Sequence, residues 1–482
     1  MLGAAKFVTG SMMLLETESL KIVIDCGLVQ TNDTIKDITE NGDIYNINPS
    51  EIDYLILTHA HIDHAGKIPL LYKKGFNGPI LTTEPTMNLC KIALNDCAFI
   101  WKREIEKLNK NKKYSKRSTY RNKINKNNIK PLYTSDDVED VMMNFRGYGY
   151  NKEIILNNEV SIIFHPVGHI MGAASIEVIV NQMNNNYMKQ KRIVFSGDIS
   201  GLHDKHPFIK SVEYINKADY LILESTYGDR KHKKMNVEKK LTEIIKSTCI
   251  DRKKTVLIAS FSIQRLQELI YYLYDIYKYN DFDDIPIYID TPMGTKVTLE
   301  VYAKMLDFYN DKDKKLIEDE GDLFLNWNQL KYTVSQKQSK NLLNDSPKII
   351  IASAGMMQAG RIIHHIDYYI PSKGCAVVLT GYCAIGTFGR KLLDTLKYSK
   401  SSIQGIEGKI LDIHAKIFQL DGMSGHADYD DLLKYALNIK NLKKIILNHG
   451  DINSINFLKT KLQEKINIPI LIPNKGQKIT LK

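Results

Sequence analysis

The feature that most constrains this chain is a run of histidines and an aspartate directly after a short apolar stretch. The run reads His-Ala-His-Ile-Asp-His over residues 59–64, and the apolar residues 53–57 before it are typical of a buried strand. Imidazole and carboxylate side chains together favour zinc or a similar borderline cation. Because side chains alternate along an extended chain, His59 and His61 are expected on one side, with Asp63 and His64 past a turn. The spacing predicts a loop that can serve two metal ions.

Two metal ions need more ligands than this loop supplies. Three single residues elsewhere share one setting: each follows an apolar run and stands beside a glycine. They are His169, Asp198 and His449. Polar groups held at strand ends are a common arrangement for a site, because the scaffold fixes them while solvent still reaches them. These residues are therefore candidates to complete the metal site.

Strand-like and helix-like patterns alternate along the chain. Apolar alternation at helical spacing favours helices over 263–278 and 298–309. Short β-branched runs predict strands over residues 21–25, 53–57, 160–164, 192–196, 220–224 and 255–259. The alternation predicts an α/β protein.

The order of these motifs resembles the metallo-β-lactamase superfamily, whose fold is an αββα sandwich with metals at one edge of two sheets. Three further segments resemble the β-CASP branch of that superfamily: Glu-Ser-Thr-Tyr-Gly at 224–228, Ser-Gly-His-Ala-Asp at 424–428 and Asn-His-Gly-Asp at 448–451. Within the branch the chain is most similar to ribonucleases related to the cleavage-and-polyadenylation endonuclease and to their bacterial and archaeal counterparts.

This resemblance implies a division of the chain into three parts. Residues 1–228 and 419–482 would form the two parts of the metallo-β-lactamase domain. Residues 229–418 would form an inserted β-CASP α/β domain that covers the metal cleft.

The resemblance also implies the metal ligands, for which we expect two zinc ions. One ion would be held by His59, His61 and His169, the other by Asp63, His64 and His449, with Asp198 between them. A negative bridging carboxylate would reduce the repulsion between two divalent ions roughly 3.5–4 Å apart. The expected reaction is attack on a phosphodiester by a hydroxide activated by the two metals, in a cleft between the domains.

Four residues are expected to be catalytic, in part by position in the family motifs. Asp25 matches an aspartate that orients ligands or the attacking water. Asp63 joins the set as a metal ligand at the reacting centre. His426 is a candidate general acid for the leaving oxygen and Glu224 its orienting carboxylate, help that is typically worth about 10²–10⁴-fold. In the sequence, 202 positions separate these last two residues.

Charge and cysteine content bear on the partner and the compartment. The chain has 66 Lys+Arg against 55 Asp+Glu, and residues 101–130 are dense in lysine, arginine and asparagine. This excess suits a polyanion, although a genome bias or a solvated face would produce it as well. The six cysteines form no C-x-x-C pair, and no apolar run reaches the ~18 residues of a membrane helix. We expect a cytoplasmic protein, no membrane, single-stranded RNA as partner and a homodimer as a possible assembly.

The function predicted is therefore a zinc-dependent ribonuclease. Two alternatives remain open from the sequence: a metallohydrolase of the same fold acting on a small ester, lactone or thioester, and a non-catalytic RNA-binding scaffold.

Overall fold

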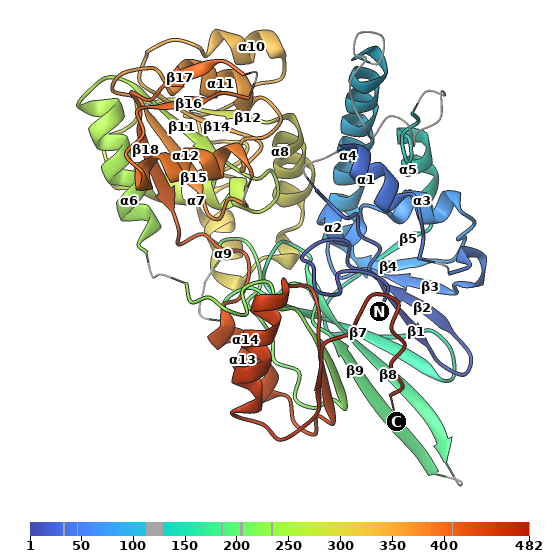
Figure 1. Ribbon diagram of the computed structural model, residues 1–482. Coiled ribbons are helices and arrows are strands. Elements are labelled where there is room, and N and C mark those ends of the chain that lie inside the picture. The colour runs from blue at the N-terminus through green and yellow to red at the C-terminus, as the bar shows by residue number, and fades with distance from the viewer. Residues whose placement is uncertain are drawn as a thin grey trace.

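In the computed structural model, three main β-sheets organise the part of the chain that the structure describes, and two of them pack face to face beside a separate inserted unit (Figure 1). The structure describes residues 1–31, 34–45, 47–111, 129–184, 187–202, 206–232, 235–384, 386–406 and 408–481. Of the basic stretch 101–130 noted in the sequence, residues 112–128 lie outside the described residues.

The first sheet carries the histidine-rich loop. Its strands lie in chain order, with one antiparallel pair at the start and parallel pairs after it. They are β1 (Met13–Glu16), β2 (Lys21–Ile24), β3 (Tyr54–Ile56), β4 (Ile80–Thr83) and β5 (Phe145–Tyr148).

The second sheet brings together distant parts of the chain. Its order is β20-β19-β10-β9-β8-β7-β6, so the C-terminal strands pair beside the middle of the first half. The strands are β6 (Glu153–Ile155), β7 (Val160–Pro166), β8 (Ala174–Asn184), β9 (Tyr187–Phe195), β10 (Tyr220–Leu223), β19 (Lys444–Leu447) and β20 (Ile470–Leu471). Because β19 runs parallel to β10, the ends of both strands meet at one edge.

Side chains point alternately to the two faces of β10, so the strand packs against a different layer on each face. Tyr220 and Ile222 pack into the core between the two sheets. Leu221 and Leu223 pack under α13 (Tyr429–Asn438) and α14 (Ile452–Gln463). Helices on the far face of the first sheet complete the αββα sandwich (Figure 1). The sandwich helices are α1 (Thr34–Asn41), α2 (Ile62–Ala65), α3 (Ile68–Lys73), α4 (Glu84–Asn111), α5 (Ser135–Met142), α13 (Tyr429–Asn438) and α14 (Ile452–Gln463).

The inserted unit is a parallel sheet with helices around it. The sheet order is β13-β12-β14-β11-β15-β18, all neighbours parallel, and a small antiparallel pair is attached. The strands are β11 (Thr255–Ala259), β12 (Ile287–Asp290), β13 (Leu330–Tyr332), β14 (Lys348–Ala352), β15 (Ala376–Thr380), β16 (Ser402–Gln404), β17 (Ile410–Asp412) and β18 (Lys416–Leu420). The helices are α6 (Val237–Ile245), α7 (Arg265–Lys278), α8 (Pro292–Lys296), α9 (Asp311–Glu320), α10 (Gln336–Asn341), α11 (Ile362–Tyr369) and α12 (Phe388–Lys397).

One predicted helix is wrong in detail. The segment 298–309 forms no continuous α-helix: a π-turn covers Val297–Val301, and short 3-10 turns follow over Tyr302–Lys304 and Leu306–Phe308. The hydroxyl of Thr298 donates to the carbonyl of Gly294 at 2.8 Å, a back-bond of the kind that bends helices.

The boundaries of the inserted domain stay a proposal. We propose that the domain ends just after Leu420, because β18 pairs with β15 and a boundary at residue 418 would cut this strand. Among the described residues, none of the helices combines the length and the apolar character that crossing a membrane requires.

Candidate metal centre

The candidate ligands come from loops that follow strands at one edge of the sandwich. The histidine-rich run follows β3, and α2 begins at Ile62 directly behind His61. His169 lies between β7 and β8, Asp198 follows β9, and His449 follows β19. The last two strands flank β10 in parallel, so their ends bring Asp198 and His449 together.

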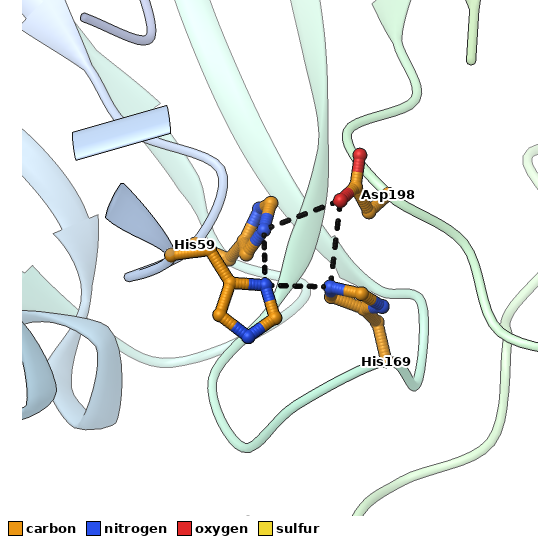
Figure 2. Close-up of side chains that lie close together, drawn as sticks. His59, His169 and Asp198 are labelled. Atoms are coloured by element: carbon orange, nitrogen blue, oxygen red, sulfur yellow. Dashed lines mark hydrogen bonds and ion pairs between the residues drawn. The ribbon is translucent and has the colours of Figure 1, made fainter. Parts of the chain in front are cut away.

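A first group joins three imidazoles and one carboxylate, which Figure 2 shows pointing toward one another. The Nδ1 of His61 lies 3.2 Å from the Nε2 of His59 and 3.0 Å from the Nε2 of His169. The Oδ2 of Asp198 lies 3.5 Å from the Nε2 of His59 and 3.4 Å from the Nε2 of His169. Three nitrogens and one oxygen are the donor types that zinc takes in proteins.

A second group lies on the other side of Asp198. The Nε2 atoms of His64 and His449 are 3.0 Å apart, and the Oδ2 of Asp63 is 3.5 Å from His449. The Oδ1 of Asp198 lies 3.3 Å from His64 and 3.5 Å from His449. The two oxygens of Asp198 thus face different groups, which is the placement expected of a carboxylate between two cations.

Neighbouring groups hold the imidazoles in orientation. The Nδ1 of His64 lies 2.7 Å from Asp25, and the Nδ1 of His169 lies 2.7 Å from the carbonyl oxygen of Gly425. In the neutral form of each ring, an oxygen acceptor on Nδ1 leaves the lone pair on Nε2, the nitrogen that faces the group. Asp25 in turn accepts from the amide and the hydroxyl of Thr58, both at 2.9 Å. Asp25 therefore lies behind the candidate ligands. Sequence reasoning missed Thr58, because a lone threonine gives no signal.

Burial and mutual repulsion keep part of the cluster neutral. Burial and the neighbouring imidazole of His64 lower the pKa of His59 well below its usual value, and burial also lowers the pKa of His169. Burial lowers the pKa of His64 as well, but Asp198 and Asp25 outweigh it and raise the pKa well above its usual value. For Asp198, burial acts to raise the pKa, and the imidazoles of His449 and His64 hold it well below. The cluster thus combines neutral imidazoles at His59 and His169 with a positively charged imidazole at His64 and an ionised carboxylate at Asp198.

One buried atom tests whether these residues fit a metal. The Oδ1 of Asp198 is buried and accepts no hydrogen bond, although two imidazole nitrogens lie within 3.5 Å. A buried carboxylate oxygen without a partner is costly unless a charge satisfies it. A cation between these groups would satisfy the oxygen and the facing lone pairs, so the residues present fit a metal.

Glu224 and His426 form a pair beside the first group. The Nδ1 of His426 lies 3.3 Å from Glu224 and 3.9 Å from Asp198. Glu224 is almost fully buried and accepts from the backbone amide of Ile199 at 2.7 Å, while the His426 side chain is 22% exposed. The carboxylate is thus fixed and the imidazole can reach a bound molecule.

A third cluster of possible ligands lies in the inserted unit. Asp290 contacts the Nη1 of Arg361 and the Nε2 of His365, each at 2.6 Å, and accepts from the hydroxyl of Ser339. The same hydroxyl contacts His364 at 2.7 Å. Because a guanidinium already balances this carboxylate, the cluster reads as a structural ion pair at the end of β12.

Three parts of the chain resemble known domain families. Three domain families match along the chain: the metallo-beta-lactamase superfamily at residues 5–137, the Beta-Casp domain at 266–392, and the Zn-dependent metallo-hydrolase RNA specificity domain at 410–473. The last of these contains His426 and His449.

Similar proteins were found over most of the chain. Ribonuclease TTHA0252 of Thermus thermophilus is 27% identical over 93% of this chain and 92% of its own length. The RNase J-like protein of Methanocaldococcus jannaschii is 28% identical over 98% of this chain and 97% of its own length. Transcription termination factor FttA of the same organism is 26% identical, with 93% of this chain covering 66% of that protein.

A solved structure also shares the fold. A protein of unknown function from Enterococcus faecalis V583 aligns over all of this chain and 98% of its own, with a TM-score of 0.53 at 15% identity.

The sandwich and the grouped histidines and aspartates define a metallo-hydrolase of the metallo-β-lactamase fold. The match to the Beta-Casp domain then points to one branch of the metallo-β-lactamase superfamily. The chain belongs to the β-CASP branch of the metallo-β-lactamase superfamily, as the motifs predicted, and the predicted fold class is confirmed.

Proposed function

We propose that the protein is a zinc-dependent ribonuclease that hydrolyses phosphodiester bonds of single-stranded RNA. The observation that carries the proposal is the position of Asp198 between two histidine groups, with His426 and Glu224 beside it. The names of the similar proteins, a ribonuclease and an RNase J-like protein, and the RNA specificity domain at 410–473 support RNA as the substrate class.

Two zinc ions fit the residues present. His59, His61 and His169 would hold one ion, and Asp63, His64 and His449 the other, with Asp198 serving both. When bound, such ions lower the pKa of water toward neutrality and polarise a phosphate. Asp25 holds the ring of His64 in place, and Thr58 fixes Asp25.

His426 is placed to donate a proton to the leaving oxygen. Burial lowers its pKa, but the carboxylates of Glu224 and Asp198 outweigh this effect and raise the pKa to about 9. The ring is therefore protonated near neutral pH, and its partial exposure leaves it within reach of substrate. An alkoxide leaves poorly without such a proton, so we assign His426 as general acid and Glu224 as the group that orients it.

The reacting face lies where the inserted unit meets the sandwich. The ring of Tyr227, next to His426, is 6.2 Å from the ring of Tyr382 in the inserted unit. A junction of two domains admits a flexible strand more easily than a stiff duplex, which supports single-stranded RNA. A homodimer and a cytoplasmic location stay predictions.

The test is cleavage of a labelled RNA by the zinc-loaded protein in water enriched in oxygen-18. Attack by water places one heavy oxygen in a terminal phosphate of the product, and Asp198→Ala or His64→Ala should abolish this product. His414→Ala, which removes an exposed imidazole from the inserted unit, is the matched control. Cleavage that persists in Asp198→Ala, or products ending in a cyclic phosphate, would contradict the proposal.

A further inference from the structure

An arginine lies against two tyrosine rings at the junction of the sandwich and the inserted unit. The guanidinium carbon of Arg230 is 5.1 Å from the ring centre of Tyr227 and 4.9 Å from that of Tyr382. A cation is attracted electrostatically to the face of an aromatic ring, so these contacts restrict the motion of the guanidinium. Tyr382 belongs to the loop after β15, so the three side chains join two parts of the molecule.

This group of three side chains lies next to the proposed general acid. The ring centre of Tyr227 is 5.6 Å from that of His426, and the ring of His232 packs on its edge at 5.3 Å. His232 also hydrogen-bonds through its Nε2 to the carbonyl oxygen of His426 at 2.8 Å. A group held by Arg230 would therefore lie on the side of the site where His426 serves the leaving oxygen.

The charge of Arg230 is only partly used within the protein. In the part of the chain that the structure describes, its one ion pair joins Nε to Asp229 at 3.4 Å, and the side chain is 40% exposed. Asp229 is shared, because the hydroxyl of Ser454 donates to the same oxygen at 3.0 Å.

Other arginines of the inserted unit are more firmly paired. Arg361 contacts the buried Asp290 at 2.6 Å, and Arg265 pairs with the buried Glu268. Arg390 contacts Asp394 at 3.0 Å. Among these four arginines, Arg230 is the one that combines contacts with two aromatic rings, a long ion pair and a position beside His426.

We propose that Arg230 binds a phosphate of the RNA strand adjacent to the scissile one, on the leaving side of the reaction. The inference rests on the proposed function. A planar guanidinium forms paired hydrogen bonds with phosphate oxygens. Contacts with the two tyrosine rings limit the motion of this guanidinium before the phosphate binds. Tyr382, which is 39% exposed, offers its remaining surface to a base of the same strand. Arg230 is thus a substrate-binding residue that distinguishes a polymer from a small phosphodiester.

The alternative is a purely structural clasp between the two units. The two roles differ in the kinetic constant that they change for RNA. A clasp would act on kcat for RNA, because its loss would disturb His426 and its surroundings, whereas a phosphate contact would act on KM. A phosphate contact would affect only substrates long enough to reach Arg230.

The experiment compares zinc-loaded wild type, Arg230→Met and Arg230→Lys on a single-stranded RNA oligonucleotide and on bis(4-nitrophenyl) phosphate. For Arg230→Met we expect KM for RNA to rise about tenfold, the effect of one charge-assisted contact, with kcat for RNA and turnover of the small ester within about twofold. Arg230→Lys should restore part of the loss. Plots of log kcat/KM against log salt should be shallower by about 0.7 for Arg230→Met, because one phosphate contact is gone.

A neighbouring charge provides the control. Lys231 pairs with Asp430 at 2.6 Å and is 65% exposed, so Lys231→Met removes the same charge one residue away and should leave KM unchanged. Unchanged KM in Arg230→Met, equal losses on both substrates, or the same effect in Lys231→Met would overturn the inference. If Arg230→Met does not fold, the same comparison with Arg230→Lys decides. A wild-type protein that hydrolyses the small ester but never RNA would instead refute the proposed function.

Discussion

Glu224 and His426 are separated by 202 positions in the chain, and their side chains lie 3.3 Å apart. The carboxylate is buried and held by the amide of Ile199, whereas the imidazole is partly exposed. Helix α13 begins at Tyr429, three residues after His426. Its N-cap is Asp428, whose side chain accepts a hydrogen bond from the amide of Asp431. This cap fixes the loop that presents His426, so the position of the proposed proton donor depends on Glu224 and on the backbone of this loop.

Removing the imidazole should slow the cleavage of RNA without removing the metals. We expect His426→Ala to lower kcat by about 10²–10⁴-fold, the usual worth of a general acid. Turnover of bis(4-nitrophenyl) phosphate should fall far less, because nitrophenolate leaves without a proton. Steady-state kinetics on both substrates, with zinc content from mass spectrometry, checks this. An equal loss on both substrates would argue against the acid role.

The pH dependence should move when Glu224 loses its charge. The protonated ring of His426 is the active form, so kcat falls as pH rises through its pKa. Burial lowers this pKa and Glu224 is the largest influence that raises it, so Glu224→Gln should shift the alkaline limb to lower pH. A pH–rate profile of both proteins measures the shift, and an unmoved limb would contradict the pairing.

The histidine-rich loop depends on a glycine that faces it. A Cβ atom on Gly27 would lie 1.6 Å from the carbonyl oxygen of Asp63, so Gly27→Ala must displace the loop. We expect this variant to lose zinc affinity and most activity, since Asp63 and His64 move together. Gly149→Ala is the matched control, because its Cβ meets nothing closer than 4.0 Å. Zinc retained at full stoichiometry in Gly27→Ala would show that the loop tolerates the shift.

The Asp290 cluster should control the stability of the inserted unit. Burial acts to raise the pKa of Asp290, but hydrogen bonds from His365, Ser339 and other neighbours outweigh it and lower the pKa. A carboxyl with a lowered pKa in the folded protein stabilises it above about pH 4 and loses this effect as pH falls further. Asp290→Asn should therefore cost about 3 kcal/mol near pH 6, and the difference from wild type should narrow below pH 4.

Fluorescence can follow this unit alone. The chain has two tryptophans, and Trp327 lies in the inserted unit, so urea unfolding in a Trp101→Phe background reports on it. A gap between wild type and Asp290→Asn that stays constant from pH 6 to pH 3 would show that ionisation of Asp290 does not matter.

The sequence predicted the strand ends and the motifs well, because both are local. Apolar runs ending in His59, Asp198 and His449 identify strands whose ends carry polar groups, and all three residues meet in the structure. That these three residues lie close together could not be derived from the local sequence, because it depends on the pairing of β19 with β10. Only the family resemblance supplied that long-range contact.

Other features could not be predicted from the sequence, for physical reasons. The segment after Lys296 has helical spacing, but the hydroxyl of Thr298 donates to the carbonyl of Gly294. A π-turn and short 3-10 turns take the place of the expected α-helix. Thr58 gives no pattern, and its role appears only through its contact with Asp25. Arg230 follows the family motif at 224–228 by two residues, yet its contact with a second ring requires Tyr382 from the loop after β15.

The most direct test of the account is a zinc titration of the chelated protein, with bound zinc and RNA cleavage measured on the same samples. The account predicts an inactive metal-free protein and full activity only when two zinc ions are bound per chain. Full cleavage by the metal-free protein, or saturation of activity at one ion per chain, would contradict it.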